Sequence, residues 1–188
     1  MIVGQKIRLR PLEEGDLALA ARWRNQARVL AQFFSPYPVA LSEQRQWYQR
    51  YLADDRERMW VIETLDGRPI GTLALCEIDL HHQRAELGRV MIGEEDCLGR
   101  GYAADAVRTL AAYAFREANL NRIYLQVLSD NTRAIHLYER CGFQIEGLLR
   151  RAVWKGGAFR DVLLMAALRD DWLAARGDGG SPERAIGE

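Results

Sequence analysis

The chain has 188 residues, of which 26 are Lys or Arg and 26 are Asp or Glu, so its formal net charge is zero. This balance argues against a chain-wide electrostatic attraction to nucleic acid or to an anionic membrane surface. The length and an apolar fraction of 48% predict a single globular domain, which we place at residues 1–175.

The N-terminal residues do not resemble a signal peptide, and no apolar run approaches the roughly 18 residues of a membrane helix. The cysteines Cys76, Cys97 and Cys141 are far apart and lack a Cys-x-x-Cys spacing, which disfavours a disulfide framework and a zinc site. Adjacent His81 and His82 would point to opposite sides of a strand, so we expect them in a polar loop. These patterns predict a cytoplasmic protein that binds no metal.

The first half of the chain predicts one strand, two helices and then three strands. Period-two alternation predicts a strand at residues 6–10, and a helix is expected at 14–29 with acidic residues near its N-terminus. After an aromatic loop at 33–38, Ser42 can cap a second helix. Three strands follow, at residues 59–64, 69–78 and 85–92.

The second half begins with the strongest helical pattern in the chain. Apolar residues in 101–118 recur at i, i+3, i+4 and i+7, and a strand is expected around 123–127. The Gly- and charge-rich residues 176–188 predict a disordered tail. The remaining elements are a helix at 131–141 and strands at 143–153 and 159–168, joined by a turn at 156–157. The element order predicts an α+β fold with a mostly antiparallel sheet.

A glycine-bearing loop at residues 98–103 lies between a strand and the long helix. Gly99 and Gly101 allow the backbone to curl around an anion, and the unpaired amides at the helix start favour negative charge. The loop therefore predicts a diphosphate site, with a plain turn into a helix as the alternative. It matches neither the Walker pattern nor the full dinucleotide fingerprint.

This loop and residues 129–143 resemble the GNAT superfamily of N-acetyltransferases, in the branch with ribosomal-protein N-terminal, spermidine and amino-sugar nucleotide acetyltransferases. Residues 23–25 are similar to the amino-sugar members, and residues 77–79 with 82–86 are similar to the spermidine members. The resemblance implies a mixed, mostly antiparallel sheet of six to seven strands, flanked by about four helices. Shorter matches support it at 113–115, 119–123, 146–147 and Asp161.

The resemblance implies acetyl-CoA as the donor and assigns residues to it. Amides of 99–103 would hold the pyrophosphate, the strand at 90–92 would pair with the pantetheine arm, and Asn131 would hydrogen-bond that arm. Leu98 stands where the family often has Gln or Arg, so Arg100 is expected to replace that contact. The donor-binding set is Val90, Met91, Ile92, Leu98, Gly99, Arg100, Gly101, Tyr102, Ala103 and Asn131.

The resemblance also places Tyr138 beside the thioester sulfur, where its phenol would protonate the departing thiolate. The alternative is an aromatic side chain that packs on the core. Glu86 is the candidate general base, directly or through water, with a solvated strand glutamate as the alternative. No Ser/His/Asp or Cys/His pattern offers a nucleophile, which favours direct transfer in a ternary complex over an acyl-enzyme.

Four aromatic residues near the first helices, Trp23, Phe33, Phe34 and Tyr37, are expected either to line the acceptor pocket or to pack in the core. Residues 33–37 replace the paired glutamates of spermidine enzymes, which weakens the case for a polyamine. The basic residues Arg150, Arg151 and Lys155 are expected at a solvated strand end or against phosphates of CoA or the acceptor.

The leading functional hypothesis is acetylation of a primary amine on a small molecule, either an amino-sugar nucleotide or a polyamine. A protein N-terminal amine is the alternative acceptor, and a non-catalytic acetyl-CoA-binding module is the alternative from another class. No nucleic-acid or membrane partner is expected. A homodimer is suggested by the resemblance alone.

Overall fold

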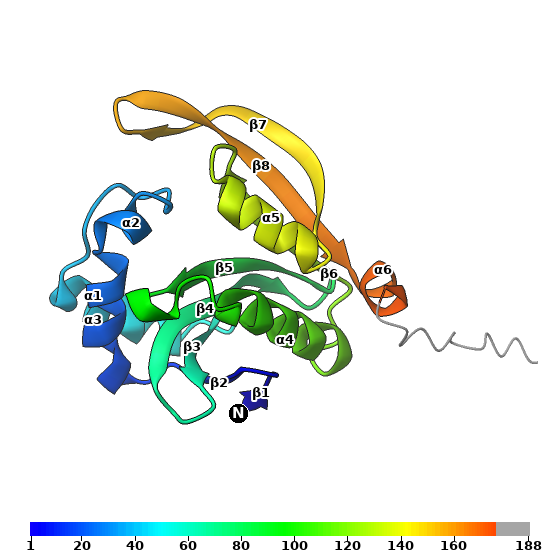
Figure 1. The fold of residues 1–188 in the computed structure, drawn as a ribbon, viewed down its shortest axis with the longest axis horizontal. Helices are drawn as coiled ribbons and strands as arrows, with labels where there is room; N and C mark the ends of the chain where they lie inside the picture. The colour runs from blue at the N-terminus through cyan, green and yellow to red at the C-terminus, as the bar shows by residue number, and fades with distance from the viewer. Residues whose placement is uncertain (176–188) are drawn as a thin grey trace, which may run out of the picture.

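The computed structural model describes residues 1–175, so the tail predicted at 176–188 lies outside the described residues. The described strands form one sheet of eight, in the order β1-β2-β3-β4-β5-β6-β8-β7 (Figure 1). The strands are β1 (Ile2–Val3), β2 (Ile7–Pro11), β3 (Arg58–Thr64), β4 (Pro69–Asp79), β5 (Arg84–Ile92), β6 (Arg122–Leu128), β7 (Gln144–Lys155) and β8 (Ala158–Leu168).

The helices flank this sheet. The helices are α1 (Leu17–Arg24), α2 (Ala27–Leu30), α3 (Leu41–Leu52), α4 (Tyr102–Arg116), α5 (Thr132–Arg140) and α6 (Arg169–Ala174), with short 3-10 turns η1 (Glu14–Asp16) and η2 (Glu95–Cys97). The α+β class and the mixed, mostly antiparallel sheet are confirmed. The sheet has one strand more than the expected range because the two-residue β1 is too short to show a period in the sequence.

The helix expected at residues 14–29 is instead divided into η1, α1 and α2. The break comes at Asn25 and Gln26, and Gln26 has an extended backbone with ψ of 134°. The side chain of Asn25 donates to the carbonyl of Val39 at 2.9 Å and accepts from its amide at 2.8 Å. A residue that ties the chain to a loop 14 positions away ends the helix there, and helical periodicity does not reveal such a contact.

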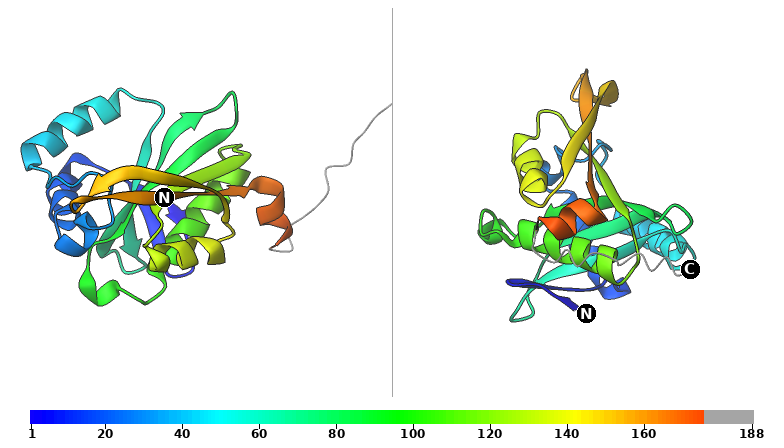
Figure 2. Two further views of the ribbon diagram at one scale, coloured as in Figure 1. Left: turned by 90° about the horizontal axis from the view of Figure 1, so that it is seen from above. Right: turned by 90° about the vertical axis from the view of Figure 1, so that its right-hand side faces the viewer.

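Helices cover both faces of the sheet (Figure 2). One face packs against α4 and α5 in a core that includes Leu110, Ile123 and Ile135. The other face packs against α1 and α3 through Leu17 and Tyr48. As the periodicity predicted, α4 buries its apolar side: Ala106, Val107, Leu110, Ala111, Ala114 and Phe115.

The sheet opens between its two parallel strands, β5 and β6. They pair only where residues 84–86 face 122–124, and Glu86 opposite Tyr124 is the last pair. Beyond that point β5 runs on to Ile92 bonded to β4, while β6 stays bonded to β8. We call this opening the wedge; its β5 side is the unpaired edge of residues 87–92. The backbone groups on that edge are available to another extended chain.

A β-bulge shapes the β5 side of the wedge. Thr72 pairs with Met91 and Ala74 with Gly88, so two residues of β5 face one of β4. Arg89 in the bulge has φ of 53°, in the left-handed region that few residues other than glycine adopt. The Thr72 hydroxyl donates to the carbonyl of Arg89 at 3.0 Å and holds this conformation.

The long β7–β8 hairpin extends from the sheet edge toward α2 (Figure 1). At its tip the ammonium of Lys155 donates to the carbonyl oxygens of Leu30, at 2.9 Å, and Phe33. The hairpin tip therefore contacts α2 and the loop after it, which precede it by more than 120 residues along the chain.

Close packing of Trp23 on the backbone of Gly93 predicts a marked loss of stability when Gly93 is changed to Ala. A Cβ at Gly93 would overlap the indole ring of Trp23. We expect Gly93→Ala to lower the free energy of unfolding by about 1–3 kcal/mol, measured by urea denaturation. Gly15→Ala is the matched control, because a Cβ at Gly15 would meet nothing within 4 Å. Equal losses in both variants would contradict the packing argument.

Candidate active site

The loop before α4 has the backbone of an anion cradle. Gly99 and Gly101 have φ of 75° and 85°, which glycine adopts without steric cost. Gly101 is the N-cap residue of α4, and no side chain caps this helix start. No described residue accepts a backbone hydrogen bond from the amides of 99–103. A Cβ at Gly99 would meet nothing within 4 Å, so space lies beside these amides. A diphosphate fits this arrangement.

The side chain of Lys6 also contacts this loop. The sequence pattern predicts Lys6 only as part of the first strand. Its ammonium donates to the carbonyl of Arg100 at 3.2 Å, and its backbone amide donates to the carboxylate of Asp105 at 2.7 Å. Asp105 is buried in the first turn of α4 and fixes the N-terminal segment there. A contact across 94 residues leaves no local signal in the sequence.

The side chains of several predicted donor-binding residues are part of the core. Leu98, Tyr102 and Ala103 pack against the main core, so these residues offer their backbone. Of the β5 residues, Met91 and Ile92 are buried. Val90 on β5 is half-buried, and Arg100 in the loop is exposed.

Arg28 of α2 shapes the far end of β5. Its guanidinium donates to the carbonyls of Ile92, at 2.9 Å, and Gly93, at 2.6 Å. The carbonyl of Ile92 therefore already has a partner, and the open edge of β5 effectively lies before this residue.

Helix α5 carries the two other residues expected near the donor. Asn131 is its N-cap, and its side-chain oxygen accepts from the amide of Ala134 at 3.2 Å, which leaves its NH2 group for a ligand. The Sγ of Cys141 donates to the carbonyl of Ala104 at 3.6 Å, so the end of α5 is fixed against the first turn of α4. The structure thus brings the helix of Tyr138 and the glycine loop to neighbouring positions.

Tyr138 is partly buried, with its ring 5.9 Å from that of Phe143 in an edge-on arrangement. Burial, and then the nearby Cys141, raise the pKa of its phenol above the ordinary value of about 10. The phenol therefore keeps its proton through the neutral range. A group in that state can donate a proton and cannot serve as a base.

Glu86 is at the apex of the wedge. Its neighbours Ala85 and Leu87 point into the core on the α4 side, so alternation directs Glu86 to the opposite face. Burial, and then repulsion from Glu77, raise its pKa, although Arg89 opposes the shift. A carboxyl with a raised pKa is a stronger base near neutral pH. Tyr138 packs against the core on the α4 side, whereas Glu86 points to the other face, so the two residues lie on opposite faces of the sheet.

The aromatic residues near the first helices take three different positions. Trp23 is 1% exposed, packs against Val29 and Met91, and donates from its indole nitrogen to Glu94 at 2.8 Å. Its ring is enclosed and supports β5 from behind, because Gly93 leaves room for it. Phe33 is half-buried beside this group, Phe34 is partly exposed, and Tyr37 is 74% exposed.

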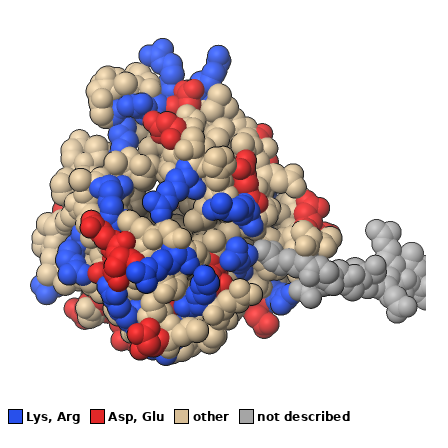
Figure 3. All heavy atoms as spheres, in the orientation of Figure 1, with Lys and Arg blue, Asp and Glu red and all other residues tan. Residues whose placement is uncertain are grey.

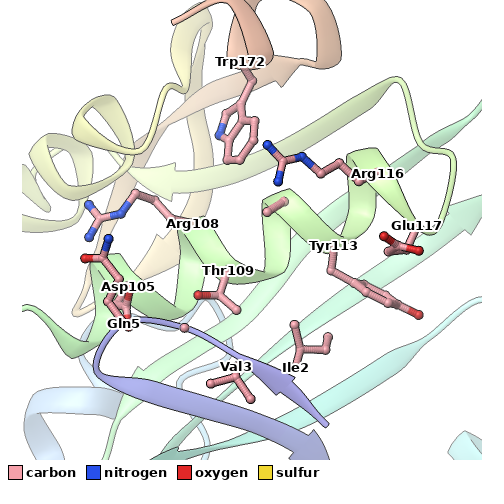
Figure 4. Close-up of a pocket in the computed structure, with 12 residues that line it drawn as sticks. Ile2, Val3, Gln5, Asp105, Arg108, Thr109, Tyr113, Arg116, Glu117 and Trp172 are labelled. Carbon is pink, nitrogen blue, oxygen red and sulfur yellow. The ribbon is translucent and has the colours of Figure 1, made fainter. Parts of the chain in front are cut away.

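Two open hollows in the described part of the chain are lined by residues other than those of the wedge. An open hollow of ≈ 610 Å³ is between β1 and α4, lined by Asp105, Arg108 and Tyr113, with Trp172 of α6 above (Figure 4). Another, of ≈ 730 Å³, lies on the β7–β8 hairpin beside Arg150. Neither contains the predicted catalytic residues.

Two findings concern metals and membranes. Among residues 1–175 no group of three or more His, Cys, Asp or Glu side chains is placed to hold a metal ion. None of the helices in that range is long and apolar enough to cross a membrane.

A mixed sheet that opens between two parallel strands, with an uncapped helix start beside the opening, defines the class of CoA-dependent acyltransferases. A family model described as the acetyltransferase (GNAT) domain matches residues 6–144. The chain belongs to this family and is an N-acetyltransferase.

The similar proteins include enzymes for small amines. Spermidine N(1)-acetyltransferase of Vibrio cholerae is 32% identical over 171 residues, covering 91% of this chain and 98% of that one. The Escherichia coli K12 enzyme of the same name is 33% identical over 168 residues, 89% of either chain. The putative ribosomal N-acetyltransferase YdaF of Bacillus subtilis is 28% identical, covering 90% of this chain and 95% of that one.

A solved structure of one of these enzymes has the same fold as this chain. The crystal structure of the Vibrio cholerae spermidine N-acetyltransferase in complex with CoA and spermine has a TM-score of 0.83 and 33% identity. The match covers 89% of this chain and 98% of that one.

Proposed function

We propose that this chain transfers the acetyl group of acetyl-CoA to a primary amine of a small molecule, by direct transfer in a ternary complex. The observation that carries the proposal is the row of unpaired amides at the start of α4, beside the open edge of β5. The two features fit a donor with a diphosphate at one end and an extended amide arm at the other. A relative bound to both CoA and spermine supports a small amine as the second substrate.

The residues around the wedge hold the donor. Amides of 99–103 bind the diphosphate, with the ammonium of Lys6 close to the same loop. The unpaired edge of β5 around Val90 and Met91 bonds the amide arm, and the free NH2 group of Asn131 adds a donor. When bound, acetyl-CoA supplies an activated acyl thioester.

The chemistry divides between the two faces of the wedge. An alkylammonium has a pKa of about 10 and must lose a proton before it can attack a carbonyl. Glu86 takes this proton, directly or through a water molecule. A backbone N–H of β5 stabilises the developing oxyanion. As the C–S bond breaks, Tyr138 donates its proton to the departing sulfur, and its phenolate then takes the second proton from the new amide nitrogen.

The pH dependence of kcat/KM tests the role of Glu86. Activity should fall as the pH falls through the pKa of Glu86, because the protonated carboxyl is no base. Glu86→Gln should remove this acidic limb and lower kcat/KM by about 10²–10⁴-fold. Glu77→Gln should shift the limb to lower pH, because it removes a negative charge that raises the pKa of Glu86. Glu139→Gln, at an exposed position on α5, is the control. An unchanged limb in Glu86→Gln would rule out this base.

Two classes of small amine are candidate acceptors. The spermidine acetyltransferases among the relatives support a polyamine. An amino-sugar nucleotide is supported by a different observation, the cationic side chains of Arg24 and Lys155 around Phe33. The name of the ribosomal relative supports a protein N-terminus as a further alternative.

The assay follows release of free CoA thiol with spermidine, an amino-sugar nucleotide and a short peptide as acceptors. We expect thiol release with a small amine and little with the peptide. Acetyl-CoA binding without thiol release from any amine would contradict turnover and leave a non-catalytic binding module.

A further inference from the structure

Three cationic side chains from three separate elements meet beside the wedge. Arg24 comes from the last turn of α1, Arg89 from the bulge of β5, and Lys155 from the tip of the β7–β8 hairpin. The guanidinium of Arg24 lies 4.0 Å above the ring of Phe33, whose carbonyl accepts from Lys155. We call these three residues the cationic cluster. Lys and Arg side chains surround a hollow near the middle of the face in Figure 3.

The described residues supply too little negative charge for this cluster. Arg89 pairs with Glu57. Arg24 donates only to the carbonyl of Ser35, at 3.2 Å, and its Nη1 is buried without a hydrogen-bond partner in the described part of the chain. Lys155 has two carbonyl partners and no carboxylate among residues 1–175. A buried cationic nitrogen without a partner is costly, and an anion bound there would offset this cost.

The electrostatics of the cluster agree with its geometry. Burial, and then the charge of Arg89, lower the pKa of Arg24. Burial, and then the charge of Arg24, lower the pKa of Lys155. Arg89 therefore repels Arg24, and Arg24 repels Lys155. A single anion placed between these three cations would reduce both repulsions.

The position of the cluster indicates which molecule brings the anion. Arg89 directly precedes Val90 on the open edge of β5, and Arg24 stacks on Phe33, a residue expected either at the acceptor pocket or in the core. The diphosphate cradle at Gly99 and Gly101 uses another cation, Lys6. The cluster lies between α1, the bulge of β5 and the hairpin tip, on the side of the fold where the acceptor is expected.

We propose that the cationic cluster is a subsite for an anionic group, a phosphate or a carboxylate, on the acceptor that carries the reactive amine. This inference rests on the proposed function and narrows it to amines that also carry negative charge. A polyamine, which is cationic along its whole length, would be repelled by the same three residues.

Matched acceptor pairs test the subsite. Glucosamine 6-phosphate is compared with glucosamine, and β-alanine with β-alaninamide, so that each pair differs in one anionic group; spermidine is the polycationic reference. We expect kcat/KM to favour the anionic member of at least one pair by about tenfold to a hundredfold, the worth of one or two charge-assisted hydrogen bonds. The two pairs distinguish a phosphate from a carboxylate.

Variants assign the preference to the cluster. Arg24→Gln should reduce the anionic-to-neutral ratio of kcat/KM to near one, and Arg24→Lys should retain part of it. Arg45→Gln removes an exposed arginine from α3 and should leave the ratio intact. Because Lys155 also fixes the hairpin, Lys155→Met is interpreted only through the same ratio and with its melting temperature measured. A ratio near one in the unmodified enzyme, or spermidine as the best acceptor, would overturn the proposal.

A readout without catalysis separates this inference from the proposed function. With the diphosphate cradle filled by saturating CoA, inorganic phosphate should raise the Tm of the unmodified chain and raise that of Arg24→Gln much less. Equal shifts in both would refute the subsite. A loss of acetyl-CoA affinity in Arg24→Gln would also refute it, because the anion would then belong to the donor. Absence of turnover with every amine would contradict the proposed function and leave the phosphate result to decide on the subsite.

Discussion

Replacing Gly101 by Asp is expected to abolish binding of acetyl-CoA while the protein stays folded. The new carboxylate would occupy the N-terminus of α4, where the free amides and the helix dipole favour negative charge. A Cβ at Gly101 would be 3.6 Å from the ammonium of Lys6, which would pair with the carboxylate. The variant thus carries its own anion in the cradle and repels the diphosphate. We expect acetyl-CoA affinity to fall by about a hundredfold or more, measured by isothermal titration calorimetry.

Gly101→Asn is the matched control for this variant. Asn has the shape of Asp and is, with Asp, among the residues that adopt a positive φ most readily, so both bear a similar cost at φ of 85°. The difference in affinity between the two variants therefore reports the charge alone. If the Asp variant binds acetyl-CoA as tightly as the Asn variant, the diphosphate is not held at this helix terminus.

The parts of the fold that could be predicted from sequence are those with local causes. The apolar spacing of α4 and the glycines of its preceding loop act within a few residues, and both are found where they were expected. The wedge could be inferred only from the family resemblance, because the pairing of β5 with β6 ends at Glu86 for reasons of sheet geometry that no short pattern carries.

The features that the sequence did not reveal depend on contacts between distant residues. Lys6 reaches the glycine loop across 94 positions, and Lys155 reaches Phe33 across 122. Basic residues at the end of β7 are compatible with a solvated strand end until the fold places one of them against α2. Trp23 was expected at a pocket or in the core. Its ring is enclosed because Gly93, which has no side chain, leaves room for it, and this contact lies 70 positions away in the sequence.

These long-range contacts also bear on specificity. The residues proposed for the donor cradle, apart from Lys6, lie within one short loop of the sequence. By contrast, the cationic cluster is assembled from α1, β5 and β7, three elements that meet only in the folded chain. An enzyme of this family can therefore keep its donor chemistry and exchange its acceptor through a few substitutions at such a junction.

Tyr138→Phe is expected to lower kcat by about 10²–10⁴-fold, the usual contribution of a general acid, with little change in acetyl-CoA affinity. The substitution removes only the hydroxyl, so the edge-on contact with Phe143 and the packing of α5 remain. A thiolate would then have to leave without a proton from the enzyme. Steady-state kinetics give kcat, and calorimetry with acetyl-CoA gives the affinity.

A second phenol provides the control for Tyr138. Tyr113 lies on α4, half-buried, with its ring 6.3 Å from that of Trp60 and away from the wedge, so Tyr113→Phe removes a comparable hydroxyl without touching the reaction. Equal losses of kcat in the two variants would indicate a general effect on the fold. Equal losses of kcat and of acetyl-CoA affinity in Tyr138→Phe would assign its hydroxyl to donor binding. The raised pKa of Tyr138 adds a further constraint: a proton lost only above the ordinary phenol range cannot produce an alkaline decline of activity near pH 8, so any decline there has to come from another group.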